Sequence, residues 1–380
     1  MANTDSKPKR ALVCAGGTGG HLFPAHALAS ELTRRGYDVH LVSDARTERF
    51  AKDFPCVERH TIKSATLSGR NPIQLLKAFY SLFAGYLSAR RLMGKVQPDV
   101  VIGFGGYPTV PPLLAASTKG YPTMIHEANA VLGRANKFLS DKVMAVALGL
   151  PLIGKTPWRF FYTGNPVRDD ALIAAEKAYA PSNEGETFCL TVFGGSQGAQ
   201  VFSTVVLKAI AQLPEPLRKR LKVVQQARAE DQDAVKKAYE MMEVPADVAP
   251  FFENMVGHIG DSHLVICRSG ASTTAELAVI GRPAILVPYP HALDHDQAAN
   301  AAALVENGGG WVKKQDGFSA EWLAEELQRM MEDASVLETA ARNAKEQGRP
   351  DAAQRLANAA HALANRQELT QELVDQPSET

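Results

Sequence analysis

The sequence has little cysteine and none of the motifs that would place cysteine in a metal or redox site. Its four cysteines, Cys14, Cys56, Cys189 and Cys267, are far apart and form no C-x-x-C pair. This spacing argues against a zinc cluster, a redox dithiol or a secreted disulfide framework, and fits a reducing cytoplasm. The sequence also lacks the P-loop pattern and the kinase motifs, so nucleotide hydrolysis is disfavoured. An apolar content of 45% with 22% charged residues excludes disorder or coiled coil as a description of the whole chain.

Long apolar stretches are interrupted wherever they begin. Residues 100–118 carry no charge, but glycines and prolines break the run. Basic residues precede an apolar stretch at residues 10–15, yet the glycine-rich residues 16–21 end it too early for the apolar region of a signal peptide. The sequence therefore predicts neither a transmembrane helix nor a signal peptide.

The formal net charge is zero, but the charge is unevenly distributed along the chain. Residues 1–170 carry 22 lysines and arginines against 12 acidic residues, whereas residues 171–380 carry 19 against 29. The first half is thus net +10 and the second net −10. Such asymmetry favours a basic half that meets phosphates or an acidic membrane surface; the alternative is a chance distribution of solvated charge.

The pattern of apolar runs predicts two domains of one design. Residues 10–15 form a strand-like run, followed by a glycine-rich loop, a helical pattern at 24–35 and a second strand at 39–43. The same order starts again at residues 187–193, with glycines at 194–199 and a helix to about residue 212. Further strand-like runs at 100–104, 264–267 and 284–287 alternate with helices. The predicted fold class is α/β, with two Rossmann-like doubly wound parallel-sheet domains facing an interdomain cleft and a boundary near residues 164–168.

Three glycine-rich turns between a strand and a helix predict phosphate binding. They lie at residues 16–21, 194–199 and 268–273. Backbone N–H groups in such turns, together with the helix N-terminus, bind phosphate oxygens. NAD is disfavoured because Gly17 and Gly19 are followed by Gly20-His21-Leu22 and not by the x-x-Gly of a dinucleotide fingerprint. The turns favour a ligand with a pyrophosphate.

Six ordered motifs carry a resemblance to a known family. They are Gly16-Gly-Thr-Gly-Gly-His-Leu-Phe-Pro-Ala25, Gly103-Phe-Gly-Gly-Tyr107, His126-Glu-Ala-Asn129, Gly164-Asn-Pro-Val-Arg168, Gly194-Gly-Ser-Gln-Gly-Ala199 and Cys267-Arg-Ser-Gly-Ala271. Together, over about residues 10–360, the chain resembles the MurG family, the N-acetylglucosaminyltransferases of bacterial peptidoglycan synthesis. The resemblance implies the GT-B fold and transfer of GlcNAc from UDP-GlcNAc to the 4-hydroxyl of MurNAc in lipid I, giving lipid II with inversion.

The resemblance also implies an organisation and a set of partners. It divides the chain into an acceptor and membrane-facing domain (10–167), a UDP-GlcNAc-binding domain (168–345) and C-terminal helices that pack back on the first domain (346–374). The implied partners are UDP-GlcNAc, lipid I, an anionic membrane surface and other cell-wall synthesis and division proteins, with no nucleic acid. The implied location is the cytoplasmic face of the bacterial inner membrane, bound peripherally.

The resemblance implies the following donor contacts. Glu276 would bind the ribose hydroxyls, Phe252 the uracil edge through its backbone, and Gln297 the sugar hydroxyls. The full set of donor residues is Thr18, Gly19, Gly20, Asn129, Arg168, Ser196, Phe252, Ala271, Ser272, Thr273, Thr274, Ala275, Glu276 and Gln297. Two simpler interpretations stay open: Glu276 could complete a capping box with Ser272 or Thr273, and Arg168 could form an ordinary surface ion pair.

The catalytic prediction centres on the first glycine turn. His21 is the candidate general base, because a neutral imidazole can take a proton from an attacking hydroxyl near pH 7; Glu127 is the rival. Tyr107 and His126 would line the acceptor side. The chain departs from the family pattern at Ala128, where a glutamine is usual. It departs again before Gln297, where Asp296 replaces a histidine or glutamine, so the sugar contacts there are open.

The helix expected at residues 73–91 carries two adjacent apolar stripes beside Lys77, Arg90 and Arg91. One stripe can face the core, and the other would form an interfacial membrane contact. The membrane prediction names the stripe Leu75, Phe79, Leu82 and Tyr86; the other consists of Leu76, Tyr80, Phe83 and Leu87. A helix buried between layers is the alternative.

Three other functions compete. They are a different GT-B enzyme that uses a UDP-sugar, such as a glycolipid glucosyltransferase; a UDP-GlcNAc 2-epimerase; and a non-catalytic sugar-nucleotide sensor or membrane scaffold. Asp231-Gln-Asp233 and Asp294-His-Asp296 have carboxylate spacings that can hold Mg²⁺. Neither is assigned a catalytic metal, and no cofactor is predicted.

Overall fold

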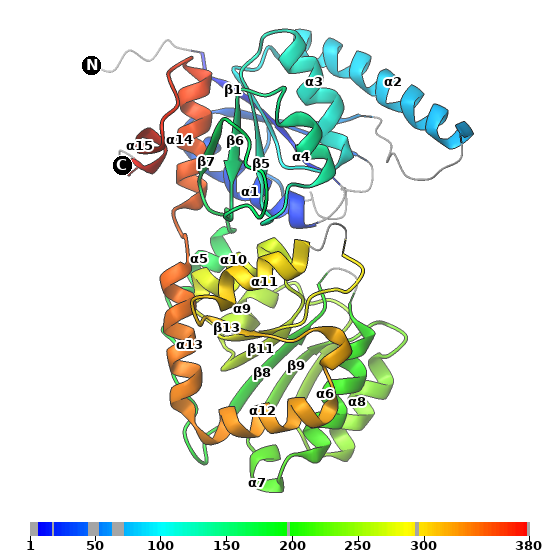
Figure 1. Cartoon of the computed structure of the whole chain (residues 1–380), viewed down its shortest axis with the longest axis vertical. Coiled ribbons are helices and arrows are strands. Elements are labelled where there is room, and N and C mark those ends of the chain that lie inside the picture. Colours follow the sequence, from blue (N-terminus) through cyan, green and yellow to red (C-terminus); the bar gives the residue numbers. More distant parts are fainter. Residues whose placement is uncertain are drawn as a thin grey trace. The chain divides into compact units, whose positions relative to one another are not determined.

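The computed structural model describes residues 7–16, 19–44, 53–62, 72–195, 198–292 and 296–377, without the side chains of 72–76, 78 and 79. The chain divides into two compact units (Figure 1). The first unit comprises residues 1–168 and 350–380, and the second comprises residues 169–349. The boundaries expected from the sequence, after residues 167 and 345, lie close to these.

The first unit is built on a parallel sheet of seven strands in the order β3-β2-β1-β4-β5-β6-β7. The strands are β1 (Arg10–Cys14), β2 (Asp38–Ser43), β3 (Glu58–Thr61), β4 (Val100–Gly103), β5 (Thr123–Glu127), β6 (Ala145–Leu148) and β7 (Phe160–Tyr162). The helical segments that precede residue 168 are α1 (Gly19–Arg34), α2 (Pro72–Val96), η2 (Tyr107–Thr109), α3 (Val110–Thr118) and α4 (Arg134–Leu139).

The central strands of this sheet are buried on both faces. Side chains alternate across a strand, so Ala11 and Val13 of β1 join one apolar cluster while Leu12 and Cys14 join the other. Helix α1 covers the first of these faces, and α2 and α3 cover the second. A sheet covered on both faces needs continuous apolar strands, which explains why the sequence shows short apolar runs and no strict alternation.

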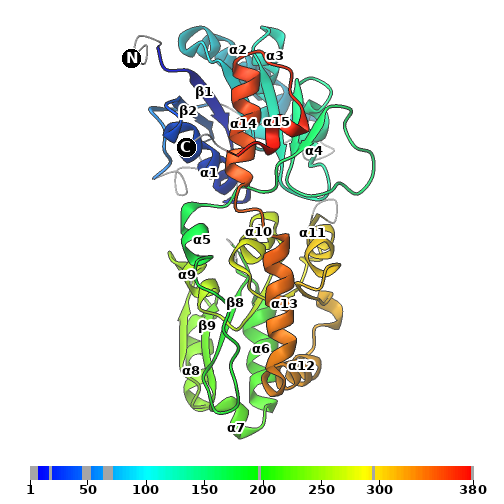
Figure 2. The same cartoon turned by 90° about the vertical axis from the view of Figure 1, so that its left-hand side faces the viewer.

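The end of the chain completes the first unit. Helix α14 (Ala352–Ala364) packs beside α1, and α15 (Gln371–Asp375) follows it (Figure 2). The chain leaves the helical conformation between them, after Ala364, and Arg366 takes a left-handed φ of 56° in the break.

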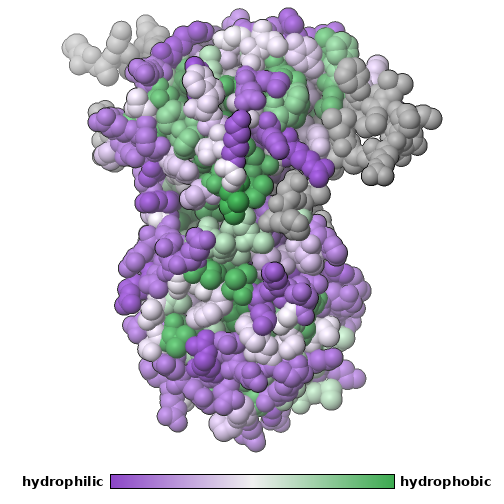
Figure 3. Space-filling model, viewed as in Figure 1, coloured by the Kyte–Doolittle hydropathy of each residue, from purple (hydrophilic) through white to green (hydrophobic). Residues whose placement is uncertain are grey.

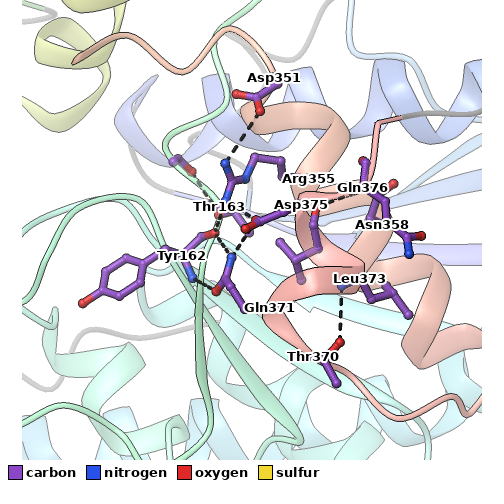
Figure 4. A network of polar contacts seen from close by, with 12 residues as sticks. Tyr162, Thr163, Asp351, Arg355, Asn358, Thr370, Gln371, Leu373, Asp375 and Gln376 are labelled. Atoms are coloured by element: carbon purple, nitrogen blue, oxygen red, sulfur yellow. Dashed lines mark hydrogen bonds and ion pairs between the residues drawn. The ribbon is translucent and has the colours of Figure 1, made fainter. Parts of the chain in front are cut away.

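A polar network fixes this C-terminal segment on β7, the edge strand of the sheet (Figure 4). The side-chain carbonyl of Gln371 accepts a hydrogen bond from the Tyr162 N–H at 3.0 Å, and its amide donates to the Tyr162 carbonyl at 2.9 Å. Arg355 pairs with both Asp351 and Asp375. The Gln371 amide thus satisfies edge groups that would otherwise be open to another strand.

The second unit contains a parallel sheet of six strands in the order β10-β9-β8-β11-β12-β13. The strands are β8 (Phe188–Phe193), β9 (Leu221–Gln226), β10 (Ala246–Ala249), β11 (Leu264–Cys267), β12 (Ala284–Leu286) and β13 (Gly310–Val312). The helices are α5 (Asp169–Ala174), α6 (Gln200–Gln212), α7 (Glu215–Arg218), α8 (Gln232–Met241), α9 (Met255–Gly260), α10 (Ala271–Ile280), α11 (Asp296–Val305), η4 (Gln315–Gly317), α12 (Ala320–Glu332) and α13 (Ala334–Gln347). Its core gathers Phe188, Phe202, Tyr239 and Leu323.

The predicted fold class is confirmed: the chain forms two α/β units, each with a doubly wound parallel sheet. In a parallel sheet the carboxyl ends of all strands meet at one edge, where ligands bind in such folds. The cleft expected between the domains stays a prediction. Among the described residues, no helix is both long enough and apolar enough to cross a bilayer.

Candidate functional site

The first glycine turn follows β1 at the carboxyl edge of the first sheet. Helix α1 begins at Gly19, five residues before the predicted start, so His21 lies in its first turn. Gly17 and the predicted donor contact Thr18 lie outside the described residues. Gly16 packs against Pro108, and a Cβ added to Gly16 would lie 2.5 Å from Pro108 Cγ. Only glycine fits there, which explains one glycine of the motif without reference to a ligand.

The ring of His21 is held by backbone groups from two loops. Its Nδ1 lies 3.1 Å from the Gly16 carbonyl oxygen. A carbonyl can only accept, so Nδ1 donates and the lone pair of the neutral ring is on Nε2. Gly105 and Gly106, at φ 89° and 76°, pass beside the ring, and a Cβ on Gly105 would lie 3.1 Å from His21 Cδ2. The glycines of the second motif therefore leave room for the candidate base.

Glu127, the predicted rival base, accepts hydrogen bonds on both of its carboxylate oxygens. The carboxylate is 3% exposed at the end of β5. Oε1 accepts from the Asn129 N–H at 3.0 Å and its Nδ2 at 2.9 Å. Oε2 accepts from the Gly133 N–H and from Asn136 Nδ2, each at 2.9 Å. A buried carboxylate with four donors positions a loop, because its lone pairs are already used.

Two asparagines that sequence reasoning missed complete this loop. Asn136 Nδ2 also donates to the His126 carbonyl at 3.0 Å. Asn165 donates from Nδ2 to the Ala128 carbonyl at 2.8 Å. They hold residues 128–136 from both sides, and the predicted donor contact Asn129 is fixed as a result. Asn165 lies inside a quoted motif, but Asn136 lies in no motif, and no sequence signal singles it out.

His126 is buried, which corrects the expectation that it lines an acceptor surface. The residue is 1% exposed in the central strand β5. Its Nε2 lies 3.3 Å from the Gly164 carbonyl oxygen, and its ring contacts Phe104 with centroids 5.4 Å apart. Burial lowers the pKa of His126 to about 4, so the ring is neutral at pH 7. Tyr107 begins η2 and is half-buried, so it stays a predicted acceptor contact.

Arg168 brings a positive charge to the start of α1. Its guanidinium lies over the ring of Phe23, 4.4 Å from the centroid. Phe23 in turn packs on the first helical residue, since a Cβ on Gly19 would lie 3.1 Å from the Phe23 ring. The guanidinium and the helix N-terminus both favour an anion. The donor contact of Arg168 and the alternative of a surface ion pair both stay open.

The second unit repeats the glycine turn after β8. Gly195 and Gly198 have φ values of 82° and 66°, and Ser196 between them lies outside the described residues. Gln226, at the end of β9, accepts from the Gly194 N–H at 3.0 Å and donates to the Pro250 carbonyl at 3.1 Å. Sequence reasoning missed this glutamine, which links the turn to the loop that carries Phe252.

Phe252 is half-buried in the loop between β10 and α9. Its ring packs edge-on against His258, with centroids 5.2 Å apart. That contact fixes the backbone at Phe252, the group predicted to meet the uracil edge.

Helix α10 begins directly after the third glycine turn. Its N-cap is Gly270, which offers no side chain to the first N–H groups, and Ser272 and Thr273 are partly exposed. An N-terminus without a side-chain cap leaves backbone donors for an anion. The Thr274 hydroxyl donates to the Ala271 carbonyl at 3.0 Å, and its donor contact stays a prediction.

Glu276 is the sixth residue of α10. A capping box needs the acid at the third helical position, so that alternative is excluded. The carboxylate is 9% exposed, and its charge adds to burial in raising the pKa of Cys267, the last residue of β11. Glu276 therefore faces the carboxyl end of β11.

Gln297 fixes the start of α11. Its side-chain carbonyl accepts from the Tyr289 N–H at 2.9 Å, and its backbone carbonyl accepts from Ser269 Oγ at 2.7 Å. The amide NH₂ is the part of Gln297 that remains for sugar hydroxyls. Arg268, which sequence reasoning did not assign, donates to the Val287 carbonyl at 2.9 Å and so holds the segment after β12.

The predicted residues gather at two sheet edges. Those after β1, β4, β5 and β7 lie at the carboxyl edge of the first sheet, and those after β8, β10, β11 and β12 lie at the carboxyl edge of the second. Within each unit, motifs far apart in the sequence therefore converge.

Family models and known proteins agree with this geometry. The model described as Glycosyltransferase family 28 N-terminal domain matches residues 11–148, and the C-terminal domain model matches residues 189–356. A solved structure, the MurG of Acinetobacter baumannii, is 29% identical, with a TM-score of 0.74 over 93% of this chain and 99% of that one. A solved structure from Listeria monocytogenes, described as a "putative UDP-N-acetylglucosamine 2-epimerase", is 15% identical and shares the fold with a TM-score of 0.68 over 95% of this chain and 98% of that one.

Curated relatives are much more similar in sequence. A protein of Brucella anthropi is 57% identical over 93% of this chain and 95% of its own length, and one of Brucella canis is 55% identical over 93% and 94%. Both are named UDP-N-acetylglucosamine--N-acetylmuramyl-(pentapeptide) pyrophosphoryl-undecaprenol N-acetylglucosamine transferase. The chain belongs to glycosyltransferase family 28, in agreement with its resemblance to the MurG family.

Proposed function

We propose that this chain is an inverting glycosyltransferase of peptidoglycan synthesis. It moves GlcNAc from UDP-GlcNAc to the 4-hydroxyl of MurNAc in undecaprenyl-pyrophosphoryl-MurNAc-peptide (lipid I), which gives lipid II. The observation that supports this proposal most strongly is the sequence identity of 55–57%, over 93% of the chain, to relatives that are named as transferases with this activity. The positions of the motif residues at the two sheet edges support the same assignment.

The second unit supplies the chemistry of a nucleotide-sugar site. The N–H groups at the start of α10 and the Gly194–Ala199 turn suit a pyrophosphate. Glu276 is a carboxylate that can accept hydrogen bonds from both ribose hydroxyls. The developing charge on the departing UDP is stabilised by these fixed dipoles, with no reorganisation at the moment of reaction.

The first unit supplies the base. His21 carries its Nε2 lone pair when neutral, because Nδ1 donates to the Gly16 carbonyl. We assign Nε2 as the group that takes the proton from the acceptor hydroxyl as that oxygen attacks the anomeric carbon. Glu127 acts indirectly, because it holds the loop that carries Asn129. Asn129 and Arg168 stay predicted donor contacts.

Two rival functions fit parts of the structure. The fold is shared with a UDP-GlcNAc 2-epimerase, but a relative that is 15% identical supports the fold alone. A non-catalytic sensor would need no base, whereas the two loops around His21 are built to hold its ring in one tautomer. The position of His21 favours a transferase over a sensor.

A direct assay separates these functions. The full chain is incubated with radiolabelled UDP-GlcNAc, with and without lipid I. The transferase forms labelled lipid II and UDP only when lipid I is present. An epimerase would convert UDP-GlcNAc to its 2-epimer without an acceptor, and a sensor would leave the donor unchanged. Either of those two results would overturn the assignment.

The lipid acceptor requires contact with a membrane, and α2 offers a surface for it. Tyr80, Phe83 and Leu87 are 73%, 52% and 40% exposed, and Arg90 and Arg91 continue the same helix as exposed cations. Figure 3 shows hydrophobic surface over the part of the first unit where α2 lies. Apolar and basic groups side by side suit an anionic interface. We propose peripheral binding at the cytoplasmic face of the inner membrane.

This surface corrects the stripe predicted from the sequence. Tyr86 packs against the core of the first unit, its hydroxyl 3.0 Å from Thr118 Oγ1, and Leu82 is half-buried. The side chains of Leu75 and Phe79 lie outside the described residues. Among the described large apolar side chains of α2, the most exposed are Tyr80, Phe83 and Leu87 of the adjacent stripe, because the face with Tyr86 packs on α3.

A further inference from the structure

A group of two histidines and one glutamate lies away from the proposed site, at the edge of the first sheet. In the parallel pairing of β2 and β3, His40 is opposite Glu58 and Val42 is opposite His60. Glu58 and His60 are two residues apart on β3, so both project to the face on which His40 projects from β2. This is the face covered by α2, since Val42 belongs to the apolar cluster that includes Ala89 and Met93.

The three side chains are close enough to meet one ion. His40 Nδ1 and His60 Nε2 are 3.2 Å apart. Glu58 Oε2 lies 4.0 Å from His40 Nδ1, and Glu58 Oε1 lies 3.8 Å from His60 Nδ1. One ligand atom from each residue lies within 4.8 Å of the others, and no other such group occurs in the described part of the chain.

The spacing matches a tetrahedral metal. With Zn–N bonds of about 2.05 Å, two nitrogens on one tetrahedral Zn²⁺ are about 3.3 Å apart. The two histidine nitrogens are already near that separation, where they share a hydrogen bond that the ion would replace. The Glu58 side chain would have to rotate to bring one of its oxygens to the ion. Each neutral ring would keep its one proton on the nitrogen that does not meet the ion.

We propose that His40, Glu58 and His60 bind one divalent transition-metal ion of the Zn²⁺ class. Two imidazoles and one carboxylate suit Zn²⁺, Co²⁺ and Ni²⁺, whereas Mg²⁺ and Ca²⁺ prefer oxygen ligands throughout. The histidine side chains are 11% and 10% exposed and Glu58 is 44% exposed, so an ion can enter from solvent and keep water as its fourth ligand.

The site would fasten the edge strand β3 to β2. Strand β3 lies at the end of the sheet and has one neighbouring strand. A shared ion would add a connection between the two strands, beyond their backbone hydrogen bonds. Binding only to the folded chain raises its stability in proportion to the logarithm of the metal concentration.

Lys95 would compete with the metal ion for the Glu58 carboxylate. Its Nζ donates to Glu58 Oε1 at 2.7 Å, so an ion must share or displace this ammonium. Removing the ammonium should therefore strengthen metal binding. A cluster with a purely structural role would not respond in this way, which gives the proposal a distinctive test.

The experiment uses the full chain without a histidine tag, freed of metal by EDTA and dialysis. Co²⁺ is titrated while the visible d–d absorption is recorded, and Zn²⁺ is titrated by calorimetry. We expect one equivalent to bind with a tetrahedral Co²⁺ spectrum. Glu58→Gln and His60→Gln should weaken binding at least about 10- to 100-fold, the loss usual even for outer-shell partners. Lys95→Met should strengthen it.

The matched control is His26→Gln, because His26 is a histidine of α1 whose Nε2 meets the Asp53 carbonyl and not this cluster. It should bind metal as the parent does. Circular dichroism in EDTA checks that each variant is folded, and Glu58→Gln, at an exposed position, tests the site should His60→Gln fail to fold. Absence of binding in the parent overturns the proposal, and so does equal affinity in the parent and Glu58→Gln.

Discussion

Replacing Glu127 by glutamine separates its two possible roles. The carboxylate accepts four hydrogen bonds, two on each oxygen, from Asn129, Gly133 and Asn136. Glutamine has nearly the same shape, but one oxygen becomes an NH₂ group. Whichever way the amide is oriented, two of the four donors then face the new NH₂ group. That group is itself a donor, so these two donors lose their acceptor.

The expected cost follows from that count. A buried donor left without its acceptor costs about 1 to 3 kcal/mol, so two cost about 2 to 6 kcal/mol. In a unit of this size each kcal/mol lowers the Tm by about 2 to 4 °C, so a cost of about 4 kcal/mol corresponds to roughly 8 to 16 °C. Because the chain has two compact units and Glu127 lies in the first, the fall in Tm is expected in the unfolding transition of the first unit only.

Calorimetry of Glu127→Gln, with the exposed Glu368→Gln as control, measures this fall. Hydrogen exchange at the Asn129 and Gly133 amides gives a local readout, and both should exchange faster. An unchanged Tm, within about one degree, together with a loss of kcat of a hundredfold or more would refute the positioning role and return Glu127 to the role of base.

Three further outcomes follow from the described contacts. Glu276→Ala should raise the KM for UDP-GlcNAc roughly 5- to 150-fold in steady-state assays, from a lost hydrogen bond worth about 1 to 3 kcal/mol; an unchanged KM contradicts the ribose assignment. His126 has a folded pKa of about 4, below its unfolded value near 6.5, so the unfolded chain binds more protons and about 3 kcal/mol of stability should be lost as pH falls from 6.5 to 4. Chemical denaturation of His126→Phe should lack that part of the pH dependence. Phe83→Ser with Leu87→Ser should weaken sedimentation with anionic liposomes and raise the KM for membrane-embedded lipid I, but leave activity on a short-chain acceptor; Tyr86→Phe is the control, and loss on both acceptors would place these residues in the core.

The fold was predictable because its signals are local. Short apolar runs followed by glycine turns indicate buried parallel strands, and β1, β2, β4, β8, β11 and β12 formed at the six runs that the sequence shows. The other strands of both sheets were not predicted; β3, for example, is the polar sequence Glu58–Thr61 and has no apolar run to mark it. The start of α1 was less predictable, because Pro24 in the sequence suggests a helix start, whereas the helix begins at Gly19 and includes that proline. The break after Ala364 has no glycine or proline to mark it.

The candidate site was predictable to the level of motifs. Which motif residues act on a ligand and which hold the fold depends on partners distant in sequence. Glu127 and His126 share one motif, yet one is saturated by Asn136 and the other is buried against Phe104. The stripes of α2 are equally apolar, and only the packing of Tyr86 distinguishes them.

The most direct test of the central claim measures His21→Ala in the lipid II assay. The claim is that His21 Nε2 takes the proton of the acceptor hydroxyl, and a positioned base contributes about 10² to 10⁴ in rate. We expect His21→Ala to lower kcat by that factor and to change the Kd for UDP, measured by calorimetry on the same preparation, by less than about threefold. A kcat close to that of the parent chain would contradict this role of His21, because the proton would then have to leave to another group.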